Sequence, residues 1–94
     1  MSYRVLFHPL VDSALIDLWL NSARRADVTD AVNRLEKDLA IRPHDLGESR
    51  EGEERIAFQG PIGIEFRIDH MVGEVLVFNI WEIPRRKGPS RDNA

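Results

Sequence analysis

The feature that most constrains the fold is a strict two-residue period in the C-terminal half of the sequence. Between residues 62 and 69, apolar side chains alternate with small or charged ones, in the order Ile62, Gly63, Ile64, Glu65, Phe66, Arg67, Ile68, Asp69. Successive side chains of a β-strand point to opposite faces of a sheet, so this period predicts a strand with one apolar face. We expect the even-numbered side chains to face the core and Arg67 to face outward.

Three further segments have the composition of strands. Residues 3–7 are a short β-rich run that His8-Pro9 closes, and Gly60-Pro61 supplies a turn before residue 62. Residues 55–58 alternate, which predicts that Ile56 and Phe58 face the core while Arg55 faces outward. Residues 75–83 are apolar at nearly every position, as in an interior strand, with Leu76, Phe78 and Ile80 expected inward and Asn79, Trp81 and Glu82 expected outward.

Two amphipathic helices are predicted between the first and second strands. The first follows Pro9 and ends near residues 23–25, with apolar residues at helical spacing, namely Leu10, Ala14, Leu15, Leu18 and Ala23. The second has Asp27 or Thr29 as its cap, ends before Pro43, and carries the stripe Val28, Val32, Leu35 and Leu39. The short link between them predicts a helical hairpin with one shared apolar side.

The element order predicts an α+β domain of the form β-α-α-β-β-β. A two-helix hairpin would cover one face of a small twisted antiparallel sheet, leaving the other face open for a ligand or partner. We expect one domain over residues 1–84. Residues 85–94 form a basic tail with Arg85, Arg86, Lys87 and Arg91, expected either to be flexible and solvated or to contact phosphate or a partner.

Composition excludes several classes of protein. The 94 residues contain no cysteine, which excludes disulfides, thiolate metal sites and a cysteine nucleophile. Thirteen Lys and Arg against sixteen Asp and Glu give a net charge of −3, which argues against broad neutralisation of nucleic-acid phosphates. No apolar run approaches a membrane span, the three histidines lack metal-ligand spacing, and no glycine loop would hold a cofactor phosphate. We expect a cytoplasmic protein without metal or cofactor.

The order of these segments resembles the RelE/ParE superfamily of toxin-antitoxin toxins, also called plasmid stabilisation proteins. The resemblance covers nearly the whole chain. It rests on the opening strand Tyr3-Arg-Val-Leu-Phe-His-Pro, Leu18-Trp19, Leu39-Ala-Ile-Arg-Pro43, Gly47-Glu-Ser-Arg50, Arg55-Ile-Ala-Phe, the run from Gly60 to Ile68 and the last strand. It implies the fold described above and a cognate antitoxin as partner. It also implies growth inhibition, either by cleavage of ribosome-bound mRNA or by binding to DNA gyrase.

The residue set of the ribonuclease branch transfers only in part. The arginine that this branch carries after the glycine-aromatic turn falls on Gly63, and its lysines fall on Glu54 and Ile56. RNA cleavage needs a general base and cations on the phosphate oxygens. The candidate catalytic residues are therefore Arg55, Glu65, Arg67 and Arg85, and the candidate partner-binding or RNA-binding residues are Trp81, Glu82, Arg86 and Arg50.

The candidate site residues and the fold also have simpler interpretations. Glu65 and Arg67 share a strand face, and a solvated ion pair with a neighbouring strand explains them equally well. Three functions stay open: a ribonuclease toxin, a toxin that acts by binding a protein such as gyrase, and a superfamily member that has lost toxicity and serves as a binding module. A homodimer that covers the last strand and Trp81 is a further alternative.

Overall fold

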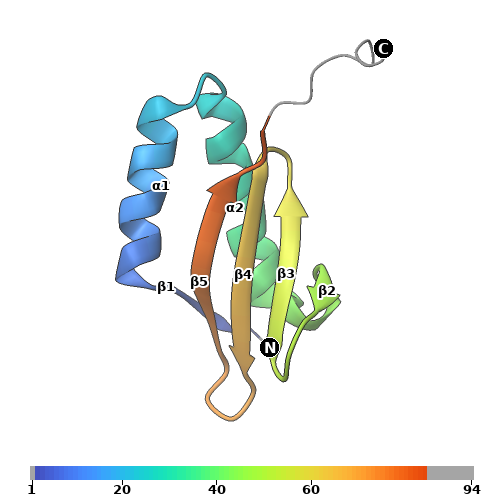
Figure 1. The fold of residues 1–94 in the computed structure, drawn as a ribbon. Helices are drawn as coiled ribbons and strands as arrows, with labels where there is room; N and C mark the ends of the chain where they lie inside the picture. Colours follow the sequence, from blue (N-terminus) through green and yellow to red (C-terminus); the bar gives the residue numbers. More distant parts are fainter. Residues whose placement is uncertain (1, 85–94) are drawn as a thin grey trace.

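The computed structural model describes residues 2–84 and confirms the predicted β-α-α-β-β-β order, with a short additional strand and a 3₁₀ turn (Figure 1). The elements are β1 (Arg4–Phe7), α1 (Pro9–Asn21), α2 (Arg25–Ile41), η1 (Pro43–Asp45), β2 (Glu48–Ser49), β3 (Glu54–Gln59), β4 (Ile62–Asp69) and β5 (Glu74–Glu82). The predictions for the basic tail, residues 85–94, lie outside the described residues. None of the helices within residues 2–84 is long and apolar enough to cross a membrane.

The five strands form one sheet in the order β1-β5-β4-β3-β2. Strands β2 to β5 pair antiparallel, as predicted, but β1 pairs parallel to β5, so the sheet is mixed. A parallel neighbour requires a long connection, and the α1–α2 hairpin that follows β1 begins that connection. Both helices lie on the same side of the sheet, which leaves its other face uncovered by the described residues (Figure 1).

The core lies between the two helices and the central strands of the sheet, β4 and β5 above all. All four even-numbered apolar side chains of β4 are buried, which confirms the two-residue period. Helix α2 contributes Val28, Ala31, Leu35 and Leu39, each at most 3% exposed. In α1 the inward side chain of the first turn is Val11, whereas Leu10 is 74% exposed. At this end of α1 the apolar stripe therefore includes Val11 in place of the predicted Leu10. Val11 lies seven residues, or two helical turns, before Leu18 and so shares the side of α1 that meets the sheet.

The helix starts also differ in detail from the predictions. His8 caps α1, since its Nδ1 accepts a hydrogen bond from the backbone N–H of Leu10 at 3.1 Å. Helix α2 begins at Arg25, so Asp27 and Thr29 lie inside it and neither is the cap. The Thr29 hydroxyl instead accepts a hydrogen bond from Nε1 of Trp19 at 3.0 Å, which ties α2 to α1.

The faces of strand β3 are the reverse of the prediction. Arg55 lies opposite Phe66, and Ala57 lies opposite Ile64, so these odd-numbered side chains share the helix side with the core. Ala57 is 1% exposed, whereas Phe58 is 58% exposed on the other side. The prediction was wrong because β4 and the packing of α2 set the register of β3, and a small side chain fits under the helix where a ring does not.

Strand β5 changes faces at a bulge. Glu65 pairs with Asn79, but the next residue, Phe66, pairs with Val77, so Phe78 is the extra residue. Before the bulge Val75 and Val77 are buried; after it Ile80 is buried. Of the three side chains predicted to face the core, Ile80 does so and Leu76 does not. The third, Phe78, is the extra residue of the bulge. Beyond the bulge Asn79 and Trp81 face outward, as predicted, whereas Glu82 returns to the helix side.

Candidate functional site

The sheet face opposite the helices, called here the open face, is organised in rows, because residues paired across strands point to the same side. The pairings place four rows on it: Phe58, Gly63 and Trp81; Glu48, Ile56, Glu65 and Asn79; Glu54, Arg67, Leu76 and Leu6; and Asp69, Glu74 and Arg4. The face is therefore aromatic at the end nearest the β3–β4 turn and charged over most of the remainder.

The aromatic row is built around Gly63. The indole of Trp81 lies across this residue so closely that a Cβ on Gly63 would stand 2.5 Å from the Cε2 and Cζ2 atoms of the indole. Phe58 meets the indole edge to face, with ring centroids 6.0 Å apart and an interplanar angle of 81°. By the resemblance described above, the nuclease branch carries a catalytic arginine at the position of Gly63. In this chain its empty side-chain volume is occupied by tryptophan.

Carboxylates outnumber guanidinium groups on the strands of the open face. The acids are Glu48, Glu54, Glu65, Asp69 and Glu74, and the bases are Arg4 and Arg67. Both bases have partners: Arg67 pairs with Glu54 at 3.0 Å, and Arg4 pairs with Glu74. Glu65 accepts a hydrogen bond of 2.9 Å from the Asn79 amide. The simple ion-pair interpretation of Arg67 thus matches the geometry, and exposed pairs of this kind contribute about 0–1 kcal/mol.

Two candidate residues lie on the helix side and have structural contacts instead. The Arg55 guanidinium donates to the backbone carbonyls of Leu46 (2.8 Å) and Gly47 (3.0 Å), so it holds the chain between η1 and β2. Glu82 accepts from the Ser22 hydroxyl at 2.9 Å and from the Arg24 guanidinium at 2.7 Å. The outward placement predicted for both residues was wrong. The register of β3 puts Arg55 on the helix side, and Glu82 shares the face of the buried Ile80, two residues before it.

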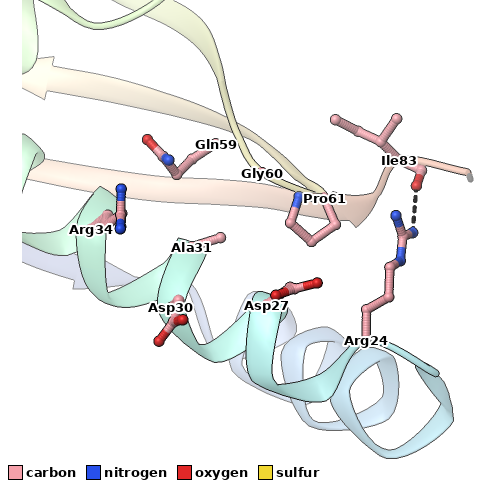
Figure 2. A pocket seen from close by; sticks show the side chains of 9 residues that line it. All are labelled: Arg24, Asp27, Asp30, Ala31, Arg34, Gln59, Gly60, Pro61 and Ile83. Carbon is pink, nitrogen blue, oxygen red and sulfur yellow. Dashed lines mark hydrogen bonds between the residues drawn. The ribbon is translucent and has the colours of Figure 1, made fainter.

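A polar cleft of about 430 Å³ lies on the helix side, between the first half of α2 and the β3–β4 turn (Figure 2). Asp27, Asp30 and Arg34 border it from the helix, and Gln59 from the end of β3. Arg24 closes one end by donating to the carbonyl of Ile83 at 2.7 Å, the hydrogen bond drawn in Figure 2. The cleft mixes both charges and lies away from the open face, and none of the predicted site residues between positions 2 and 84 lines it.

The remaining predicted residues are divided between the edge of the open face and the tail. Arg50 follows β2, and its backbone N–H donates to the carbonyl of Glu54 at 2.7 Å. Its side chain is exposed and lines a shallow hollow together with Glu54 and Glu65. Arg85 and Arg86 lie outside the described residues. Of the predicted set, the structure therefore brings Glu65, Arg67, Trp81 and Arg50 to the open face.

Sequence reasoning missed a cluster of hydrogen-bonding side chains at the opposite end of the sheet. His44 and His70, 26 residues apart, meet with 3.0 Å between Nε2 and Nδ1, and Nε2 of His70 lies 2.8 Å from a carboxylate oxygen of Glu53. The hydroxyl of Tyr3 lies 3.2 Å from Nε2 of His44. The described residues include no group of three or more His, Cys, Asp or Glu that could hold a metal ion. No local spacing could reveal this cluster, because its members come from four separate segments.

A second missed feature is an apolar groove of about 350 Å³ between α1 and α2. The large apolar side chains that line it include Leu15, Ile16, Trp19, Leu20 and Val32. Ile16 is 60% exposed and Leu20 is 53% exposed, although both are large and apolar. The signal was present as the four-residue spacing of Ile16 and Leu20, a stripe separate from the one that packs on the sheet.

Comparison with known proteins places this architecture. No protein-family model and no curated protein matches the chain. Among solved structures, a chain of the RelBE2 toxin-antitoxin complex from Mycobacterium tuberculosis has a TM-score of 0.70 and 23% identity, covering 87% of this chain and 99% of the other. A chain of the chromosomal ParDE system from P. aeruginosa has a TM-score of 0.66 and 13% identity, with coverages of 87% and 97%.

A third similar structure is the archaeal RelE-RelB complex from Pyrococcus horikoshii OT3. Its TM-score is 0.57 at 18% identity, and the match covers 92% of this chain and all of the other. All three matches span most of this chain and nearly all of the chain it is compared with. The RelE/ParE fold suggested by the order of the sequence segments is therefore confirmed.

Proposed function

We propose that this chain is the toxin of a type II toxin-antitoxin system, a cytoplasmic protein that arrests growth until a cognate antitoxin binds it. The observation that carries the proposal is the fold, which matches chains from three toxin-antitoxin complexes over 87% or more of this chain. Fold alone does not define an activity. The exposed surfaces of the chain therefore have to indicate where an antitoxin and a target would bind.

The groove between α1 and α2 supports the antitoxin part of the proposal. A partner that folds on binding can lay an amphipathic helix into an apolar groove, with side chains at positions i, i+4 and i+7 as anchors. Ile16 and Leu20 present such a stripe to solvent, and Trp19 forms the adjoining wall. An apolar segment seated there would remove from water side chains that the rest of residues 2–84 leave exposed.

Induced expression in a bacterial host tests the toxin itself. We expect growth to stop when the chain is produced alone and to continue when the product of the adjoining reading frame is produced with it. Total RNA and plasmid supercoiling, sampled at arrest, separate mRNA cleavage from inhibition of gyrase. Unimpaired growth at a verified level of folded protein would contradict the proposal and leave the non-toxic binding module as the function of this fold.

Ile16→Asp tests the groove. The exposed position tolerates the charge in the free protein, but an antitoxin helix would have to bury it unpaired, so we expect affinity for the antitoxin to fall by roughly 2 to 4 kcal/mol. Ser13→Asp adds the same charge to an exposed site of α1 that does not line the groove, and should bind normally. Titration calorimetry with the purified antitoxin measures both variants. Equal affinities for the two would place the antitoxin elsewhere.

A further inference from the structure

Three apolar side chains gather at one end of the open face, and we call them the aromatic patch: Ile56, Phe58 and Trp81. Cross-strand pairing places Phe58 and Trp81 on either side of Gly63, and Ile56 lies one row along β3. Phe58 is 58% exposed, and the edge-to-face contact holds its ring against Trp81. No other described element covers these side chains, because both helices lie behind the sheet (Figure 1). An exposed aromatic cluster on a rigid sheet is a typical anchor site for a partner.

Carboxylates border the aromatic patch. Glu65 lies next to Ile56 across the β3–β4 pair, and Glu48 lies on the other side of the same residue. Glu54 follows in the next row, where Arg67 already neutralises it. The carboxylates of Glu48 and Glu65 have no ion-pair partner among residues 2–84, and Glu65 is only hydrogen-bonded to an amide.

This charge distribution selects between two classes of partner. A nucleic acid would bring phosphates towards Glu48 and Glu65 and would find both strand guanidinium groups of the open face already paired. Arg50 adds a cation at the edge of this face, but Glu51, Glu54 and Glu65 line the same hollow and outnumber it. A polypeptide that carries an apolar side chain next to Lys or Arg would bury the apolar group on the aromatic patch and place its cations opposite the carboxylates.

We propose that the open face binds a protein segment in which an apolar anchor is flanked by basic residues, and that this segment belongs to the toxin's target. The second part rests on the proposed function, whereas the binding chemistry does not. Phe58 and Trp81 supply the contact area, and Glu48 and Glu65 select for positive charge. Arg67 takes no part in recognition beyond neutralising Glu54, in contrast to its expected role in a ribonuclease.

Calorimetry with defined probes tests the binding chemistry. The probes are a leucine peptide flanked by arginines, the same peptide with glutamates in place of the arginines, and a single-stranded RNA. We expect only the arginine peptide to bind. Phe58→Ser should weaken it by about tenfold, and Glu65→Gln by a few-fold with a smaller dependence on salt. Phe58 is exposed, so its replacement leaves the core intact, and Ile16→Asp controls for binding in the helix groove.

Other outcomes would overturn the proposal. Tighter binding of RNA than of the arginine peptide, weakened in Arg67→Ala, would assign the open face to nucleic acid. Equal binding of the two peptides, or binding unaffected by Phe58→Ser, would remove the aromatic patch from recognition. In cells, Phe58→Ser should restore growth while Arg67→Ala continues to arrest it. If the unmodified chain arrests nothing, the proposed function fails, but the calorimetry still decides the chemistry of the face.

Discussion

Replacing Gly63 with arginine is expected to unseat Trp81 and to lower the free energy of unfolding by roughly 2 kcal/mol or more, without creating a ribonuclease. The substitution introduces the arginine that, by the resemblance, the nuclease branch carries at this position. A Cβ at this position would stand 2.5 Å from two indole carbons, a separation that real Cβ contacts essentially never show. Urea unfolding measures the loss of stability, and an RNA cleavage assay tests for the gain of activity.

A double-mutant cycle isolates the cause. Gly63→Ala alone should cost about 1–3 kcal/mol through overpacking, and much of that cost should disappear in a Trp81→Ala background, where the ring is gone. Additive effects of the two substitutions would mean that the strand backbone requires glycine at position 63, and that room for the indole of Trp81 is not the reason. A stable Gly63→Arg variant that cleaves RNA would contradict both the steric argument and the assignment of the open face to a protein partner.

Gly47→Ala is expected to be more damaging than any other single glycine-to-alanine change between residues 2 and 84, at roughly 3 kcal/mol or more. Gly47 has φ +61°, and a Cβ there would lie 1.8 Å from the carbonyl oxygen of Ile56, which cannot move without disturbing strand β3. Because the neighbour is backbone, no change of side-chain rotamer relieves the collision. Thermal or urea unfolding measures the effect.

Gly52 supplies the matched control. Its φ is +56°, close to that of Gly47, but nothing lies within 4 Å of a Cβ built there. Gly52→Ala should therefore show only the cost of placing an L-residue in the left-handed region, about 1–2 kcal/mol. Equal losses for the two variants would show that backbone conformation, and not the close approach to β3, explains the requirement at Gly47.

The limits of sequence reasoning are clearest in strand β3. Ile56 and Phe58 were expected inward because they are the larger apolar residues of an alternating run, yet Ala57 is the buried one. Alternation shows that two faces differ but does not show which face a neighbouring helix covers when both carry apolar groups. As a result Arg55, expected beside Arg67, lies on the opposite side of the sheet.

The bulge at Phe78 had a similar consequence for strand β5. One extra residue exchanges the faces of everything that follows, so Trp81 is outward while Glu82 turns to Ser22 and Arg24. A nearly continuous apolar run carries no signal for where such a bulge falls, because either face accepts its side chains.

The sequence by itself determined the strand-helix-helix-strand order, the buried face of β4 and the outward direction of Arg67, because backbone periodicity and chain breakers are local properties. Only the tertiary structure decided which charged and aromatic side chains share a face, that His44 meets His70, and that Trp81 fills the space above Gly63. These relations depend on strand register and on contacts between residues far apart in the chain, and the energy of packing a whole sheet against its helices sets both.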